Sequence, residues 1–214
     1  MDSVVVLAGG ASKRMGRDKM LLEIGGVTML ESVVARFREE FEDVFISVAD
    51  EAKYPEVKAR RIVDIRRGAG PLSGLHAALA GAVCDGVFLV AADLPYASPK
   101  AAKRIIELCS GYNAGVIKLP GGMIEPLFGY YKKALLPLCE EALKSGDYRM
   151  SEILYNANTR FISQEELGGL WEERIIYNIN YPEDYTAMTL TCSHVDDTTT
   201  QPLQPKTEEG APGK

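Results

Sequence analysis

The sequence predicts a three-layer α/β protein with a mostly parallel central sheet and helices on both faces. Short apolar runs alternate with longer amphipathic stretches, which is the pattern of strands interleaved with helices. The runs at residues 4–7 and 87–91 contain no polar residue, as expected for buried strands. A length of 214 residues with 46% hydrophobic residues suits a globular chain with a sizeable core.

The predicted elements follow in order along the chain. Strands are expected at residues 4–7, 44–48, 61–63, 87–91 and 115–117, and helices at 28–41, 71–83, 99–109 and 132–143. Thr28 is a candidate N-cap because Glu31 completes a capping box three residues later. Ser98 followed by Pro99 marks a second helix start. A turn and an inserted segment are expected at residues 119–128.

One domain is expected at residues 1–190, followed by a disordered tail at residues 191–214. The tail is rich in Thr, Pro and Gly, so it cannot bury enough apolar surface to offset its ordering entropy. No apolar run approaches the about 18 residues of a membrane span, and no targeting segment is evident. We therefore expect a cytoplasmic protein. Its four widely separated cysteines are expected to be reduced thiols: Cys84, Cys109, Cys139 and Cys192.

The charge balance argues against nucleic acid as a partner. The net charge is −6 and the pI is about 5.1, whereas a nucleic-acid surface is basic. Four basic residues nevertheless cluster near the N-terminus and could supply a local field for a nucleoside triphosphate: Lys13, Arg14, Arg17 and Lys19.

This basic cluster lies in a glycine-rich segment that directly follows the first predicted strand. Gly9 and Gly10 would let backbone N–H groups approach an anion closely, and Arg14 and Lys19 add full charges. Ligands of open α/β sheets bind at the carboxyl ends of the strands, so the segment predicts a polyphosphate site. Gly16 is followed by Arg, which excludes the GxxxxGK[ST] loop, and no GxGxxG is present. An ordinary turn with solvated basic residues is the alternative.

Asp93 is the second candidate, because it follows the apolar run at residues 87–91. A carboxylate at the carboxyl end of a central strand faces the ligand crevice. Mg²⁺ prefers one or two carboxylates plus substrate phosphates, so Asp93 is predicted as the metal ligand. The alternative is a helix cap before Pro95.

The stretch LAGGASKRMGRDKMLLEIGG resembles the signature of the molybdenum cofactor guanylyltransferases, which belong to the Rossmann-like nucleotidyltransferases. GPLSGL, ADLP, EPL and NINYPED resemble further motifs in family order, and the likeness covers about residues 1–188. It implies a Rossmann-like nucleotidyltransferase fold and transfer of GMP from GTP to molybdopterin-type molybdenum cofactor. The products would be the guanine dinucleotide cofactor and pyrophosphate. Mg²⁺ would be the cofactor, and cofactor-delivery proteins or molybdoenzymes possible partners, with no role for a membrane.

The resemblance also implies roles for individual residues. Gly9 and Gly10 would hold the β- and γ-phosphates, and Arg14 would support the departing pyrophosphate. Lys19 would bridge the α-phosphate and the acceptor phosphate, and Asp93 would hold Mg²⁺. The implied catalytic set is Lys19, Arg14 and Asp93, and the implied nucleotide-binding set is Leu7, Ala8, Gly9, Gly10, Lys19, Asp64 and Asp93.

Other residues carry weaker interpretations. Asn178, Asn180 and Gly74 are candidate substrate-binding residues. The two Asn residues are equally at home in a turn, and Asp64 could be a surface turn residue. Two further side chains have no firm role: Arg149 could contact an acceptor phosphate or be an exposed helix-end residue, and Glu125 resembles a substrate-side residue.

Base selection departs from the family pattern, which often has an Asn-rich segment after the second strand. This chain has Ser-Val-Ala-Asp at residues 47–50, so CTP or another phosphorylated acceptor stays open. A nucleotide-sensing module without turnover, or a scaffold that carries the cofactor, are alternatives from other classes. Retention of both the loop lysine and the aspartate argues against a sensor.

Overall fold

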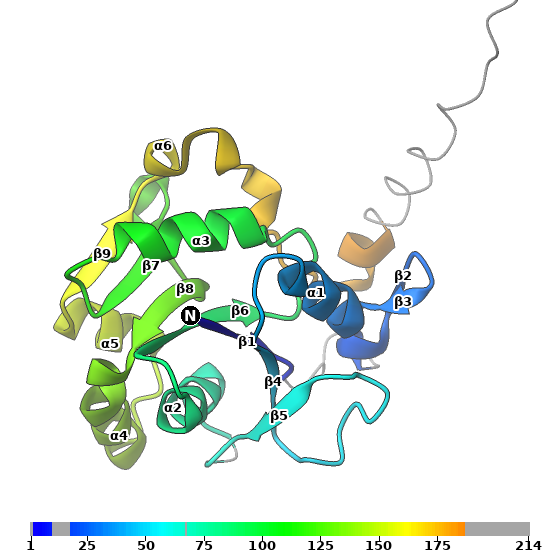
Figure 1. Cartoon of the computed structure of the whole chain (residues 1–214), viewed down its shortest axis with the longest axis horizontal. Helices are drawn as coiled ribbons and strands as arrows, with labels where there is room; N and C mark the ends of the chain where they lie inside the picture. The colour runs from blue at the N-terminus through cyan, green and yellow to red at the C-terminus, as the bar shows by residue number, and fades with distance from the viewer. Residues whose placement is uncertain (1, 10–17, 67, 187–214) are drawn as a thin grey trace, which may run out of the picture.

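The computed structural model describes residues 2–9, 18–66 and 68–186. Its centre is a seven-stranded sheet of order β5-β4-β1-β6-β8-β7-β9 (Figure 1). Only β8 runs antiparallel to the other strands of this sheet, so the predicted mostly parallel sheet is confirmed. The strands are β1 (Ser3–Leu7), β4 (Val44–Val48), β5 (Arg60–Val63), β6 (Gly86–Ala91), β7 (Ala114–Lys118), β8 (Ile124–Lys132) and β9 (Thr159–Ile162).

Helices cover both faces of the sheet, which confirms the three layers (Figure 1). Alternation along β1 divides the core: Val4 and Val6 contribute to one hydrophobic cluster, and Val5 and Leu7 to the other. The first cluster includes α1 (Met29–Arg38) and α3 (Pro99–Leu108), with the short α6 (Gln164–Leu167) beside α3. The second includes α2 (Pro71–Gly81), α4 (Leu136–Ser145) and α5 (Met150–Asn156).

The five predicted strands and the first three helices are present within a few residues of their predicted bounds, whereas the helix predicted at 132–143 begins four residues later and ends at Ser145. Lys132 is the last residue of β8, a 3-10 helix occupies Lys133–Leu135, and α4 begins at Leu136. The ladder reaches this far because β8 lies between β6 and β7 and pairs with both. The predicted turn lies at residues 119–123, between β7 and β8, where Gly121 and Gly122 have positive φ; residues 124–128, expected to belong to an inserted segment, are the start of β8.

The predicted capping box at the start of α1 is confirmed. The Glu31 backbone N–H donates to Thr28 Oγ1 at 3.2 Å, and the Thr28 N–H donates to Glu31 Oε2 at 3.0 Å. Four residues of α1 at helical spacing are buried, as predicted: Leu30, Val33, Val34 and Phe37. Ser98 likewise caps α3 by accepting from the Ala101 N–H at 3.2 Å.

Replacing Thr28 with alanine should destabilise the fold by about 1 kcal/mol, because the lost hydroxyl accepts from the Glu31 N–H and donates to Glu31 Oε2 at 2.7 Å. Thermal unfolding should show a decrease in Tm of roughly 2–4 °C for a chain of this size. Thr28→Ser keeps the hydroxyl and should unfold close to the wild-type temperature. Equal losses in both variants would contradict the capping role.

The remaining expectations concern the thiols and the chain end. Cys109 and Cys139 are buried free thiols, and burial raises the pKa of each to about 12. Neither thiol is therefore a reactive thiolate near neutral pH. Cys192 and the predicted tail at 191–214 lie outside the described residues. No helix in the described part of the chain is both long and apolar enough to cross a bilayer.

Candidate active site

The carboxyl ends of four parallel strands meet at one edge of the sheet. The chain passes from β1 outward to β4 and β5, and then crosses back to place β6 on the other side of β1. The direction of winding therefore reverses between β1 and β6, which is where open α/β sheets bind ligands. Ala8 and Gly9 follow β1, and Asp93 follows β6. The Ala92 N–H donates to the Leu7 carbonyl at 3.1 Å, which keeps these two strand ends together.

Lys19 and Asp93 form an ion pair at this switch point. Lys19 Nζ lies 2.5 Å from Asp93 Oδ2, and the two side chains are 13% and 17% exposed. They are 74 residues apart in the chain. Lys19 begins the 3-10 helix η1 (Lys19–Leu21), whose N-cap is Asp18. A small hairpin of β2 (Glu23–Ile24) and β3 (Val27–Thr28) follows and leads into α1.

The two oxygens of Asp93 differ in their surroundings. Oδ2 faces the ammonium of Lys19, whereas Oδ1 is buried and accepts no hydrogen bond from any residue that the structure describes. Buried carboxylate oxygens normally have partners, so an unpaired one needs an explanation. Asp93 does not cap α3, since Ser98 does. The helix-cap alternative for Asp93 is therefore wrong, and Oδ1 has free lone pairs for a cation or a donor group.

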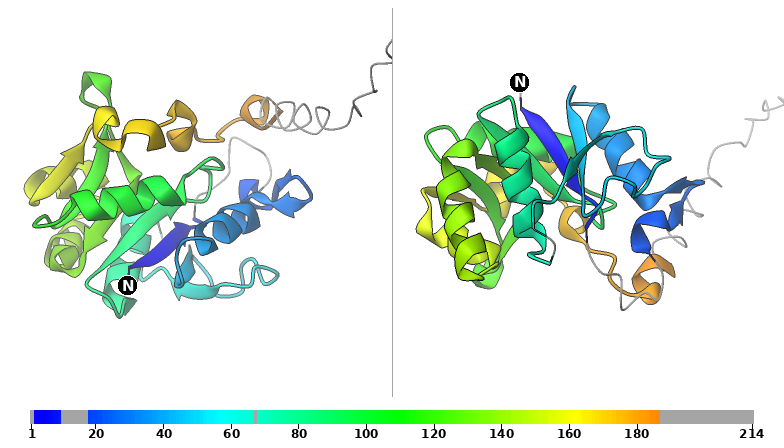
Figure 2. Two further views of the ribbon diagram at one scale, coloured as in Figure 1. Left: turned by 45° about the horizontal axis from the view of Figure 1, so that its top comes forward. Right: turned by 90° about the horizontal axis from the view of Figure 1, so that it is seen from below.

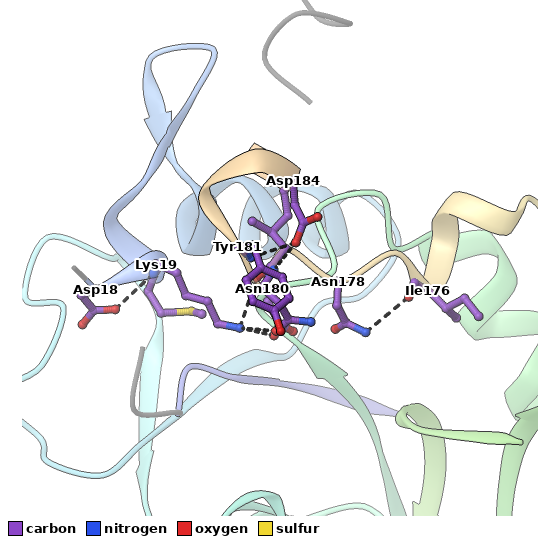
Figure 3. A network of polar contacts seen from close by, with 10 residues as sticks. Asp18, Lys19, Ile176, Asn178, Asn180, Tyr181 and Asp184 are labelled. Atoms are coloured by element: carbon purple, nitrogen blue, oxygen red, sulfur yellow. Dashed lines mark hydrogen bonds and ion pairs between the residues drawn. The ribbon is translucent and has the colours of Figure 1, made fainter. Parts of the chain in front are cut away.

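The last described segment crosses the site and completes it. It runs from η5 (Glu173–Ile176) past the switch point towards the hairpin of β2 and β3 (Figure 2). The Ile179 N–H donates to the Asp93 carbonyl at 3.0 Å. Lys19 Nζ in turn donates to the Ile179 carbonyl at 3.3 Å and to Asn180 Oδ1 at 3.4 Å (Figure 3). Lys19 is therefore held by Asp93, which follows β6, and by residues 177–186, called here the closing segment.

Asp184 holds Asn180 in place. Its Oδ2 accepts from the N–H groups of Asn180 at 2.9 Å and Tyr181 at 2.8 Å, and Tyr177 Oη donates to Oδ1 at 3.2 Å. The two backbone hydrogen bonds lower the pKa of Asp184. Asn178 lies in the same segment, and its amide donates to the Ile176 carbonyl at 3.4 Å (Figure 3).

A second polar group lies on the opposite side of β1. Ser47 at the end of β4 is buried, and its hydroxyl donates to Asp64 Oδ1 at 2.7 Å. The Asp64 N–H donates to the Val48 carbonyl at 2.9 Å, so Asp64 extends the edge of the sheet beyond β5. Gly74 of α2 faces this pair: a Cβ there would lie 2.7 Å from Ser47 Oγ and 2.6 Å from Leu7 Cδ2. The missing side chain lets α2 approach the strand ends closely.

Replacing Gly74 with alanine should destabilise the protein by about 1–3 kcal/mol, because the new methyl group overpacks against Ser47 and Leu7. Urea unfolding checks the loss as a lower midpoint with an unchanged m-value. Gly81 at the end of the same helix has open space where a Cβ would be, so Gly81→Ala is the matched control. A midpoint for Gly74→Ala equal to that of Gly81→Ala would contradict the close approach.

Comparison with known proteins agrees with this geometry. A family model described as a MobA-like NTP transferase domain matches residues 4–161. The chain belongs to this family. A probable molybdenum cofactor guanylyltransferase of Pelotomaculum thermopropionicum is 35% identical over 181 residues, which cover 84% of this chain and 88% of that protein. One of Methanosarcina mazei is 31% identical over 199 residues, which cover 87% and 89% of the two chains.

A solved structure of the MobA-like type has the same architecture. The crystal structure of molybdopterin-guanine dinucleotide biosynthesis protein A from Archaeoglobus fulgidus superimposes with a TM-score of 0.79 at 26% identity. The match covers 90% of this chain and 99% of that chain. The Rossmann-like nucleotidyltransferase fold implied by the sequence resemblance is therefore confirmed.

Within this MobA-like fold, the structure brings most of the predicted residues to one edge. Gly10 and Arg14, with Lys13 and Arg17, lie outside the described residues. Arg149 forms exposed ion pairs with Asp147 at 2.5 Å and Glu152 at 3.2 Å, which favours the helix-end alternative. The edge gathers these predicted residues: Leu7, Ala8, Gly9, Lys19, Asp64, Gly74, Asp93, Asn178 and Asn180.

The structure places Glu125 close enough to Asp93 for their charges to interact, which its sequence motif did not indicate. It lies on β8, and its Oε1 accepts from the Leu127 N–H at 2.8 Å. Burial raises the pKa of Glu125, the Leu127 hydrogen bond opposes this, and the charge of Asp93 raises it further. The negative charge of Asp93 therefore acts on the pKa of Glu125, which lies on β8, the neighbour of β6 in the sheet.

Sequence reasoning assigned no role to Ser47, Tyr54 and Asp184, which contact the site residues. Asp184 had a usable signal, because an Asp four residues after Asn180 can accept from its N–H. Ser47 and Tyr54 carry no local signal, because their partners lie far along the chain.

Proposed function

We propose that this chain transfers GMP from GTP to the molybdenum cofactor. A terminal phosphate oxygen of the acceptor would attack the α-phosphorus of GTP, the bond from that phosphorus to the bridging oxygen would break, and pyrophosphate would leave. The observation that carries the proposal is the pair of Lys19 and Asp93 at the switch point between β1 and β6. The names of the relatives supply the donor and the acceptor.

The reaction joins two anions, so its main requirement is positioning and neutralisation of charge. An ionised acceptor phosphate needs no strong general base. Lys19 would neutralise the α-phosphate and the incoming phosphate, and it is oriented for this by Asp93, Ile179 and Asn180. The N–H groups of Gly9 and Gly10 and the guanidinium of Arg14 would hold the remaining phosphates, as the family resemblance implies.

Asp93 has the properties required of a magnesium ligand. Its Oδ1 is buried without a hydrogen-bond partner in the described chain. No group of three or more His, Cys, Asp or Glu side chains with metal-binding geometry occurs among the described residues. Mg²⁺ commonly takes one or two carboxylates and completes its shell with phosphates and water. When bound, the metal would reduce the charge of the triphosphate, while Lys19 stays with the α-phosphate.

The two halves of the edge favour different substrates. Ser47 and Asp64 lie beyond β1 on the side of β4 and β5, where the base and ribose would lie next to the glycine-rich segment. Glu125 and the closing segment lie on the side of β6 and β8, where the acceptor would bind. Asp50, the other candidate for base contact, is exposed and accepts from the Ala52 N–H at 3.0 Å.

Pyrophosphate release tests the proposal when GTP, CTP, ATP and UTP are compared with Mg²⁺ and molybdenum cofactor. Turnover with GTP above the other three supports the guanylyltransferase. Preference for CTP would keep the transfer chemistry and change the product to the cytosine dinucleotide. Triphosphate binding without turnover would overturn the proposal in favour of a sensor, and cofactor binding independent of any nucleotide would favour a scaffold.

A further inference from the structure

Tyr54 has an unusual conformation for its residue type. It lies in the loop between β4 and β5, it is 6% exposed, and its φ is 53°. No other non-glycine residue in the described chain has a positive φ. Bulky side chains rarely adopt this backbone conformation, which persists only where the surroundings hold it and which clusters at functional sites.

The surroundings of Tyr54 explain how the conformation is maintained. Arg61 of β5 donates from Nη2 to the Tyr54 carbonyl at 2.5 Å. Its Nε donates to the Lys53 carbonyl at 3.3 Å, and its Nη1 to the Ala59 carbonyl at 3.4 Å. The Arg61 guanidinium therefore donates to several backbone carbonyls of this loop and fixes its conformation. In this conformation the Tyr54 side chain is buried.

The Tyr54 hydroxyl reaches both sides of the glycine-rich segment. It donates to Asp18 Oδ2 at 2.9 Å and lies 3.4 Å from the Ala8 carbonyl. Ala8 precedes Gly9, and Asp18 precedes Lys19. Burial, together with the hydrogen bond to Asp18, holds the pKa of Tyr54 well above its usual range. The hydroxyl thus remains a donor at any pH at which the enzyme would work.

Asp18 transmits this contact to Lys19. While Oδ2 accepts from Tyr54, Oδ1 accepts from the Met20 N–H at 3.1 Å and caps η1. The Leu22 N–H closes the same turn on the Lys19 carbonyl at 3.2 Å. The backbone of Lys19 is therefore fixed between an anchored cap and a closed turn, and its ammonium group meets Asp93 from there.

We propose that Tyr54 is a positioning residue for the transfer reaction: by holding Asp18 it sets the start of η1, and so places Lys19 against Asp93. This inference rests on the proposed function only for its kinetic readout. The geometric part can be tested on the protein without substrates.

The chain offers a closely matched control. Tyr130 is 5% exposed, and its hydroxyl donates to Asp2 Oδ1 at 2.9 Å. Burial and the carboxylate raise the pKa of this phenol as they do for Tyr54. Asp2 precedes β1, so the pair lies at the end of the strand away from Lys19. Tyr54→Phe and Tyr130→Phe each remove one hydroxyl from a similar environment.

Amide hydrogen exchange provides the test without substrates. In Tyr54→Phe the exchange of the Met20 and Leu22 amides should become at least several-fold faster, because the cap loses its support. In Tyr130→Phe these two amides should exchange at the wild-type rate after correction for any change in global stability. Equal protection of both amides in the two variants would overturn the proposal.

The kinetic readout uses the same variants. Tyr54→Phe should lower kcat for pyrophosphate release by about tenfold or more, with a smaller change in KM for GTP, since misplacement of a positioned group acts on the reacting geometry. Tyr130→Phe should leave kcat unchanged. Matching kcat values for the two variants would contradict the positioning role. A wild-type protein inactive with every triphosphate would contradict the proposed function, while the exchange result would still decide the role of Tyr54.

A double-mutant cycle tests the route through Asp18. Asp18→Ala removes both carboxylate oxygens, so the cap on the Met20 N–H and the contact with the Tyr54 hydroxyl are both lost. If Tyr54 acts through Asp18, the double variant should be no slower than the slower single variant. Multiplied losses in kcat would show that the two residues act independently.

Discussion

Replacing Lys19 with alanine should lower kcat for pyrophosphate release by about 10²–10³-fold, the range measured when one preorganised charge-stabilising donor is removed. The ammonium group of Lys19 contacts both the Asp93 carboxylate and the closing segment. Its loss would leave the two reacting phosphates without this positive charge. It would also leave the carboxylate of Asp93, which is mostly buried, without its ion-pair partner.

Steady-state kinetics of Lys19→Ala, Lys19→Arg and wild type would check this expectation. Arginine keeps the charge but replaces a compact ammonium with a planar fork, so Lys19→Arg should fall between the other two. Lys103 is a matched control because its ammonium also forms an ion pair, at 2.6 Å from Glu40 Oε2, but lies near Asp2 at the other end of β1. Lys103→Ala should retain near wild-type kcat. A Lys19→Ala enzyme within twofold of wild type would contradict the assigned role.

Replacing Asp93 with asparagine should lower kcat by about 10²–10⁴-fold, because metal-assisted charge stabilisation is worth several kcal/mol in a transition state. The amide has nearly the same shape as the carboxylate, so the fold should be retained. What it removes is the negative charge that would hold Mg²⁺ and that pairs with Lys19.

A Mg²⁺ titration of pyrophosphate release would separate the two functions of Asp93. Asp93→Asn should require more Mg²⁺ and should remain slow at saturation, because the ion pair with Lys19 is also lost. Asp85 lies just before the other end of the same strand and is exposed, so Asp85→Asn should behave as wild type. An unchanged Mg²⁺ dependence in Asp93→Asn would rule out this aspartate as the metal ligand.

The parts of the fold that could be predicted are those in which a local pattern and the tertiary structure agree. Residues 4–7 of β1 and 87–91 of β6 are uninterrupted apolar runs because both faces of each strand are buried. β8 escaped prediction because it contains Pro126 and Gly129, which are poor strand residues. Gly129 is required by its neighbours, since a Cβ there would lie 2.6 Å from Val116 Cγ1. β9 is a short edge strand with intermediate burial and gives a weak pattern.

The same reasoning explains which site residues could be found. Asp93 and the residues after β1 could be predicted as site residues because the carboxyl ends of parallel strands meet at one edge of the sheet. The contact between Lys19 and Asp93 could not be derived from spacing, because 74 residues separate them. The role of Tyr54 could not be predicted for a different reason. Its residue type does not indicate a positive φ, and its hydrogen-bond partners come from two other segments of the chain.

The hydrogen bond from Ile179 to Asp93 has a consequence for the stage of synthesis at which the site can form. Lys19 and Asp93 leave the ribosome early, whereas Ile179, Asn180 and Asp184 belong to the last described segment of the chain. A growing chain therefore carries Lys19 and Asp93 for most of translation without the segment that contacts them both. Incomplete chains, and fragments clipped before residue 179, should therefore bind nucleotide poorly, and the site would form only after residues 179–184 have been added.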